Sequence, residues 1–155
     1  MKLAIGCDHA GYALKARIIE TAKNLGHEII DMGCHGEASV DYPDYAVPAC
    51  KEVLEGRADR AILLCYTGVG MSMAANKVRG IRCALVGDTL TAKLTRQHND
   101  SNVLALGAGI IGAALAEEIL TVWLATPTIA TEPGRHKNRV EKLMNIERLM
   151  NTEKP

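Results

Sequence analysis

Five short apolar runs, each followed by a polar turn and then a helical pattern, are the feature that most limits the possible folds of this 155-residue chain. The runs cover residues 2–7, 27–33, 60–65, 81–86 and 102–106, and the patterns predict helices over 11–25, 44–54, 71–78, 89–98 and 112–124. Strands that are apolar on both faces and separated by helices are typical of a parallel sheet between two helical layers. We therefore predict an α/β fold, a three-layer sandwich around a five-stranded parallel sheet, in a single domain spanning residues 1–155.

The C-terminal part of the chain differs from this alternating pattern. A connector with two prolines and a glycine follows residue 124, and a final helix is expected over residues 136–150. The helix carries an apolar stripe beyond the compact domain, formed by Val140, Leu143, Met144, Ile146, Leu149 and Met150.

Charge and cysteine content exclude several classes of protein. The 18 basic and 18 acidic residues cancel, so no overall field favours nucleic acid or an anionic membrane, and no apolar run reaches the roughly 20 residues of a membrane span. The first residues, "MKLAIGCDHAG", reach Asp8 too early for a signal-peptide core. The five cysteines are odd in number and include no close metal-ligand pair, so we expect a cytoplasmic protein without disulfides or bound metal.

The stretch "AILLCYTGVGMS", residues 61–72, is the strongest local signal. A cysteine among apolar residues is usually part of a core, but Cys65 lies at the end of a strand and just before a helix start, where a thiolate is favoured. Gly68 and Gly70 allow backbone N–H groups to converge on an anion there. The stretch lacks the Gly-Lys-Ser/Thr ending of a nucleotide-binding loop, and N–H groups beside a base suit an enediolate instead.

Three further polar residues are candidates for the same edge. Asp8 and His9 follow the first strand, and His98 ends the fourth helix. Ordinary structural roles are also possible for these residues. Asp8 could cap the first helix, and a protonated His98 could interact favourably with the C-terminus of its own helix. Because all three end successive strand–helix units, we expect them to share the edge that carries Cys65.

Arg135 and Arg139 form a second candidate group. They are four residues apart and project from one face of the final helix. Two guanidinium groups suit a phosphate, although a solvated basic face is the simpler reading of the spacing alone.

Five motifs in order, covering nearly the whole chain, resemble one family: "GCDHAGYALK", "SVDYPDYA", "TGVGMSMAANKVRGIRCAL", "RQHNDSNVLALG" and "GRHKNRV". Together they resemble the B-type ribose-5-phosphate isomerases, in the family that also holds allose-6-phosphate and galactose-6-phosphate isomerases. The resemblance implies Rossmann-like subunits and a metal-independent, cofactor-free aldose–ketose isomerisation through a cis-enediolate, as in the pentose phosphate pathway. It also implies a homodimer, sometimes paired into tetramers, with active sites at the interface and a C-terminal helix that packs on the partner.

The resemblance assigns a role to each matching residue. Cys65 would move the proton between C1 and C2, with Thr67 as its polar partner, and His98 would open the furanose ring with help from Asp8. The remaining residues would bind substrate: the amides of Gly68, Val69, Gly70, Met71 and Ser72 the enediolate, Tyr42 and Asn99 the hydroxyls, and His9, Arg135 and Arg139 the phosphate.

The chain departs from the family pattern at three places that concern substrate recognition. Tyr66 stands where the family usually has a glycine, and it would either fill part of the sugar site with its side chain or impose a different backbone angle. Gly109 stands where an arginine usually contributes to phosphate binding, and "IATEPGRH" replaces a glycine pair. These departures concern the sugar and leave the base intact, so the alternatives are an isomerase of allose 6-phosphate or galactose 6-phosphate, and a sugar-phosphate-binding protein without turnover.

Overall fold

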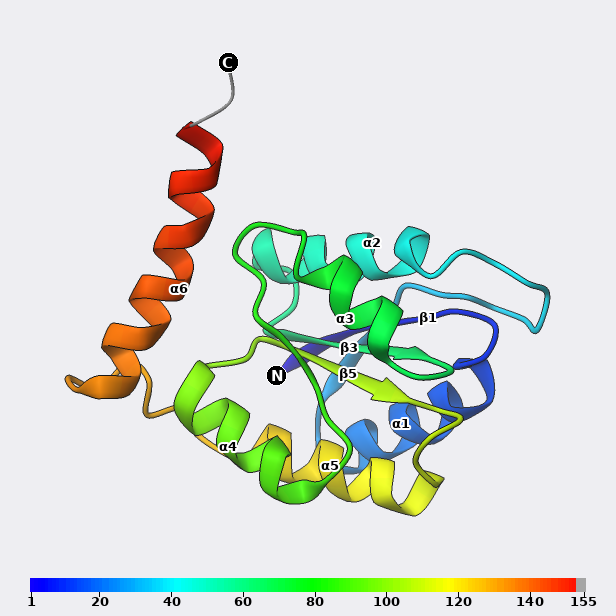
Figure 1. Cartoon of the computed structure of the whole chain (residues 1–155). Coiled ribbons are helices and arrows are strands. Elements are labelled where there is room, and N and C mark those ends of the chain that lie inside the picture. The colour runs from blue at the N-terminus through cyan, green and yellow to red at the C-terminus, as the bar shows by residue number, and fades with distance from the viewer. Residues whose placement is uncertain (153–155) are drawn as a thin grey trace.

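The computed structural model describes residues 1–152, except for the side chains of residues 148 and 150–152. Its strands are β1 (Lys2–Cys7), β2 (Glu28–Asp31), β3 (Arg60–Cys65), β4 (Cys83–Leu85) and β5 (Val103–Gly107). Its helices are α1 (Tyr12–Asn24), α2 (Pro43–Leu54), α3 (Val69–Ala75), α4 (Thr89–Asn99), α5 (Ala113–Ala125) and α6 (Arg135–Thr152). The predicted α/β fold with a five-stranded parallel sheet between helices is confirmed (Figure 1).

The strand order is β2-β1-β3-β5-β4, and all pairs are parallel. The chain moves outward from β1 to β2 and then crosses back to β3 on the other side of β1. The direction in which successive strands are added to the sheet therefore reverses between β1 and β3. In open α/β sheets, ligands bind at such a point, beyond the carboxyl ends of the strands.

The two faces of the sheet are packed with side chains of different size. Helices α1, α4 and α5 cover one face with large aliphatic residues and the buried Trp123, whereas α2 and α3 cover the other (Figure 1). On the α2–α3 face the strands present small residues, including Ala4, Ala61 and Ala105. Small side chains allow helices to approach a sheet closely, so α3 and its N-terminal loop lie near the end of β3.

Helix α6 runs beside α4 at the margin of the three layers, and its C-terminal end projects away from them (Figure 1). It begins one residue before the predicted start. Three apolar residues of its predicted stripe, Leu143, Ile146 and Leu149, are 47%, 56% and 65% exposed. The side chain of Met150 and residues 153–155 of the predicted domain lie outside the described residues. Among residues 1–152, no helix combines the length and the apolar character that a bilayer span requires.

Candidate active site

Cys65 is the last residue of β3 and lies at the carboxyl edge of the sheet, next to the point where the strand order reverses. It is only 5% exposed, and its Sγ accepts a hydrogen bond from the Gly68 N–H at 3.1 Å. An anionic sulfur accepts such a bond more strongly than a neutral thiol does. This geometry suits a sulfur that takes up and releases a proton.

Gly68 is required by the geometry of this turn. Its φ of +77° lies in the left-handed region, and a Cβ there would meet Cδ1 of Leu85 at 2.5 Å. Only glycine satisfies both constraints without strain. The residue thus turns the chain from β3 into α3 so tightly that its own N–H reaches Cys65.

Two other cysteines, Cys7 at the end of β1 and Cys50 in α2, serve the core. The pKa of each thiol is raised to about 12, in both cases by burial and for Cys7 also by the neighbouring Cys34. Both are fully buried and remain protonated at neutral pH. They pack as small apolar residues.

The first turn of α3 presents unpaired donors beside Cys65. The Val69 N–H is taken by Oγ1 of Thr67 at 3.3 Å, and the first bond of the helix itself runs from the Ser72 N–H to the Gly68 carbonyl. The N–H groups of Gly70 and Met71 precede that bond and have no acceptor within the helix. They are therefore able to donate to an anion at the carboxyl edge.

Asp8 and His9 follow β1 on the other side of the reversal point. The Asp8 N–H donates to the Leu64 carbonyl at 3.1 Å, which continues the β1–β3 pairing and brings Asp8 beside the end of β3. Oδ1 of Asp8 accepts the N–H groups of Ala10 and Gly11, as a cap would. Nδ1 of His9 accepts the Val40 N–H at 3.2 Å, so the ring proton belongs on Nε2, which is left to donate to a ligand.

Lys15 and His9 hydrogen-bond to the segment 31–40, which leads from the end of β2 to Tyr42. Lys15 is 4% exposed, and its Nζ donates to both oxygens of Asp31 at 2.9 Å and to the Cys34 carbonyl at 2.7 Å. Tyr42 ends this loop, and its ring lies against Gly70, where a Cβ would come within 2.9 Å of two ring atoms. The sequence analysis did not select Lys15, although a charged residue beside the apolar stripe of α1 was a usable signal.

The two unusual positions Tyr66 and Gly109 contact each other. A Cβ on Gly109 would lie 2.6 Å from Cζ and 2.7 Å from Cδ2 of the Tyr66 ring. The space beside the glycine is therefore filled by the tyrosine, and an arginine at position 109 would require the ring to move.

His98 and Asn99 lie at the opposite edge of the sheet. They end α4, just before β5 begins at Val103, whereas Cys65 pairs with Gly107 at the other end of β5. Four residues of a parallel strand span about 13 Å. The expectation that His98 shares the edge of Cys65 is wrong for a single chain, because a helix that follows a parallel strand returns to the sheet's amino edge.

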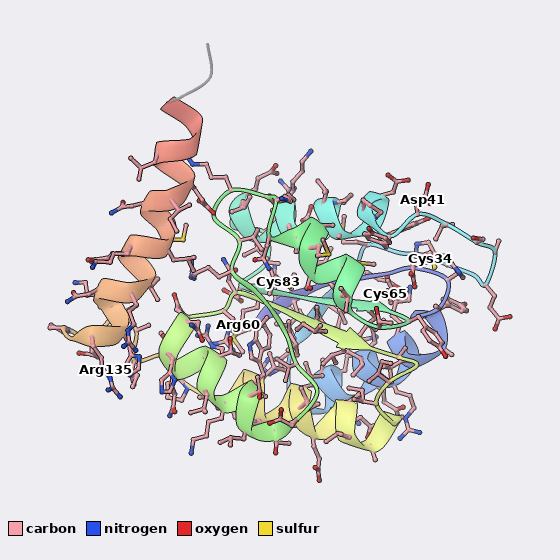
Figure 2. The ribbon with its side chains drawn as sticks, viewed as in Figure 1. Cys34, Asp41, Arg60, Cys65, Cys83 and Arg135 are labelled. Atoms are coloured by element: carbon pink, nitrogen blue, oxygen red, sulfur yellow. The ribbon has the colours of Figure 1, made fainter. Side chains whose placement is uncertain are left out.

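The N-terminus of α6 joins His98 in a second cluster. The rings of His98 and His136 stack with centroids 4.2 Å apart and planes 4° apart. Desolvation, His98 and the nearby Arg135 and Arg139 lower the pKa of His136 below its ordinary value. Figure 2 shows Arg135 on the far side of the domain from Cys65.

The residues selected from the sequence therefore form two groups in one chain. One group is the carboxyl-edge cluster of Asp8, His9, Tyr42 and residues 65–72. The other is the amino-edge cluster of His98, Asn99, Arg135, His136 and Arg139, in which His136 is an addition that the sequence analysis did not select. Within residues 1–152, no three His, Cys, Asp or Glu side chains are grouped in a way that could hold a metal ion.

Comparisons with known proteins cover almost the whole chain. Residues 3–143 match a protein family described as Ribose/Galactose Isomerase. The chain is 51% identical over 148 residues to YwlF of Bacillus subtilis (strain 168), whose name refers to a sugar phosphate without specifying the sugar; the match covers 95% of this chain and 97% of that one. It is 44% identical over 150 residues to Ribose-5-phosphate isomerase B of Escherichia coli (strain K12), covering 97% and 99%. The solved structure of ribose-5-phosphate isomerase B from Clostridium thermocellum is similar with a TM-score of 0.93 and 45% identity, covering 97% of this chain and 99% of that one.

Proposed function

The chain belongs to the ribose/galactose isomerase family of sugar-phosphate isomerases, and from that premise we propose that it interconverts ribose 5-phosphate and ribulose 5-phosphate through a cis-enediolate. The observation that carries this proposal is the placement of Cys65, whose sulfur accepts the Gly68 N–H at the point where the strand order reverses. A general base beside preorganised N–H donors is what enolisation needs.

The proton transfer uses Cys65 twice. Its thiolate takes the proton from C2 of the open-chain aldose, which leaves a thiol and an enediolate. The N–H groups of Gly70 and Met71 stabilise the negative oxygen. The proton of the C2 hydroxyl passes to the oxygen on C1, and the thiol then returns its own proton to C1, which gives the ketose and restores the thiolate.

The amino-edge cluster completes the site from a second subunit. His98 opens the furanose ring, and Asp8 assists it. Asn99 and Tyr42 bind hydroxyl groups of the sugar. His9, Arg135 and Arg139 bind the phosphate. In one chain, His98 and Cys65 lie at opposite edges of the sheet. The two clusters therefore meet only if the amino edge of one subunit faces the carboxyl edge of its partner, as a twofold dimer allows.

The exposed stripe of α6 supports such an assembly. Leu143, Ile146 and Leu149 are 47%, 56% and 65% exposed, and the first two line an open cavity between α6 and residues of β4 and α4. Packing of α6 on the partner would bury these side chains and bring Arg135 and Arg139 across with the same helix. Pairing of two such dimers into a tetramer remains compatible with this arrangement.

Solvent-exchange measurements test the proposed reaction directly. The protein is incubated in deuterated water with ribose 5-phosphate, allose 6-phosphate, galactose 6-phosphate and the free sugars, and C1 and C2 are followed by NMR. We expect deuterium at these carbons with ribose 5-phosphate. Binding of a sugar phosphate without any exchange at high protein concentration would contradict the proposal and favour a binding protein without turnover.

A further inference from the structure

The end of α4 carries a network of charged groups around Asp100. Asp100 directly follows Asn99, and its φ of +48° is a left-handed conformation that aspartate tolerates better than most residues. Its Oδ1 accepts a bond from Nη1 of Arg96 at 3.1 Å, and its Oδ2 accepts one from Nη2 of Arg82 at 2.7 Å. Arg82 also donates from Nε to the Asp100 carbonyl at 2.8 Å, and Arg96 donates to the Ser101 carbonyl. The two arginines therefore hold the segment at which α4 ends.

His98 and Asn99 lie within the turn that this network closes. The ion pair of Arg96 and Asp100 joins residues four positions apart, which is one helical turn, and His98 and Asn99 stand between its ends. Arg82 immediately precedes β4, so its bonds to Asp100 tie the end of α4 to the sheet. The backbone that carries His98 and Asn99 is therefore fixed relative to the sheet.

Arg96 is a costly residue to bury if stability is its only role. It is 5% exposed, and its Nε is buried without a hydrogen-bond partner among the described residues. Replacement of buried ion pairs by apolar residues of similar volume is often neutral or stabilising. A role in geometry accounts for this side chain better than a role in stability.

We infer that Arg96 and Asp100 are positioning residues, which hold His98 where it can open the furanose ring of the substrate. The inference rests on the proposed function, in which His98 acts in the site of the partner subunit. Ring opening needs a proton donor at the ring oxygen, and such a transfer requires a closely held donor. A loosened end of α4 would therefore slow ring opening, while the base at Cys65 would remain in place.

The two sugars of the reaction separate ring opening from proton transfer. Ribose 5-phosphate closes into a furanose through its C4 hydroxyl. In ribulose 5-phosphate, the phosphate occupies the C5 oxygen that would close a furanose onto C2, so the ketose stays open. The Cys65 thiolate can take a proton from C1 of this ketose, exchange it with deuterated water and return deuterium to C1 without a ring-opening step.

Substitutions of Asp100 and Arg96 are compared on both sugars. Asp100→Gly keeps the left-handed backbone and removes the acceptor, and Arg96→Met removes the charge at similar volume. In each variant, kcat for ribose 5-phosphate should fall about tenfold or more, because misplaced catalytic groups lose activity steeply. Deuterium entry at C1 of saturating ribulose 5-phosphate should keep its wild-type rate. Asp100→Asn, which keeps an oxygen acceptor and suits the left-handed backbone, should restore part of the lost kcat.

A reference variant and a matched control accompany these substitutions. His98→Asn should show the same profile, with kcat for ribose 5-phosphate lost and exchange at C1 of the ketose retained. Arg57 also pairs with a carboxylate, that of Glu52, but on the surface just beyond the end of α2. Arg57→Met should leave both rates unchanged. If Asp100→Gly does not fold, Arg96→Met carries the test, because it leaves Asp100 paired with Arg82.

The results separate this inference from the proposed function. A wild type that exchanges no deuterium with any sugar phosphate, or a His98→Asn variant with wild-type kcat, contradicts the function or its assignment of ring opening to His98. A wild type that isomerises ribose 5-phosphate, with Asp100→Gly and Arg96→Met variants that keep wild-type kcat or lose both rates in equal proportion, overturns only the positioning role.

Discussion

At the carboxyl edge of the sheet, Cys65 and Asp8 are buried and each accepts backbone N–H groups, whereas at the amino edge Arg135 and Arg139 are exposed on the first turn of a projecting helix. The first cluster derives its geometry from the sheet and from the turn at Gly68. The second depends on α4 and α6, which are joined by the ring stack of His98 and His136, while Glu147 of α6 also accepts the Gly80 N–H.

In the proposed mechanism, this difference separates the groups that one chain positions by itself from those that a partner would supply. A proton base must be held precisely, and the carboxyl-edge cluster holds its sulfur with the backbone. The proposed phosphate binding and ring opening would use groups that a second subunit brings to the site. Substitutions in each cluster should therefore affect different steps: proton transfer at the carboxyl edge, and phosphate binding at the amino edge.

Cys65→Ser should have the largest effect. A serine hydroxyl is much harder to deprotonate than a thiol, so kcat should fall at least about 100-fold, the scale of general base catalysis. The KM should change little, since phosphate and hydroxyl contacts remain. Initial rates with ribose 5-phosphate measure both constants.

Cys83→Ser is the control for this substitution. Cys83 starts β4 on the amino side of the sheet, and burial raises the pKa of its thiol well above the ordinary value. It should retain wild-type kcat. Near-normal turnover in Cys65→Ser would remove Cys65 from the role of base.

Arg135→Ala and Arg139→Ala should affect binding rather than proton transfer. Loss of one guanidinium from a phosphate site costs about 1.5–3 kcal/mol, or roughly 10- to 100-fold in KM. The dephosphorylated sugar should be almost unaffected. Lys137→Ala removes a positive charge from the same helical turn and is the matched control; an equal rise in KM there would mean that the arginines act only through general charge.

The smallest effect concerns pH and the attachment of α6. The pKa of His136 is lowered by desolvation and then by His98, Arg135 and Arg139. When α6 is detached, the ring loses the desolvation and the neighbouring His98, so its pKa rises toward the ordinary value near 6.5 and it binds a proton more readily. The free energy of attachment of α6 to the domain should therefore be most favourable above pH 6.5 and become less favourable as the pH falls below that value.

Hydrogen exchange measures this attachment. Protection factors in α6 should fall between pH 7.5 and 5.5 in the wild type, because protonation of His136 favours the detached helix. The change should disappear in His136→Gln. It should persist in His27→Gln, because the pKa of His27 is also lowered but this residue lies near the N-terminus, away from α6. The same pH response in His136→Gln would contradict the account.

The elements of the fold were predictable because their signals are local. Apolar runs marked all five strands, and the predicted helices differ from the observed ones by a few residues at their ends. The strand order was not predictable, since it depends on pairing between segments far apart in the chain. The start of α3 at Val69, two residues earlier than predicted, depends on the left-handed turn at Gly68.

The composition of the site was predictable in part. Cys65 and its glycines form one continuous stretch, so a local motif was enough to select them. The separation of His98 from Cys65 was predictable. A helix between two parallel strands ends at the amino edge of the sheet, so the last residues of α4 lie at the edge opposite to Cys65. The contact of Tyr66 with Gly109 needs β3 and β5 side by side, and no local pattern indicates that adjacency.

Subunit complementation tests the central claim most directly. Cys65→Ser and His98→Asn chains carrying different tags are co-expressed, and mixed dimers are isolated through both tags. If each site combines the carboxyl-edge cluster of one subunit with the amino-edge cluster of the other, one of the two sites is intact. The mixed dimers should then show about half of wild-type kcat with ribose 5-phosphate, while both parent dimers are nearly inactive. Mixed dimers as inactive as their parents, or a failure of the chains to form dimers, would contradict a site shared between subunits.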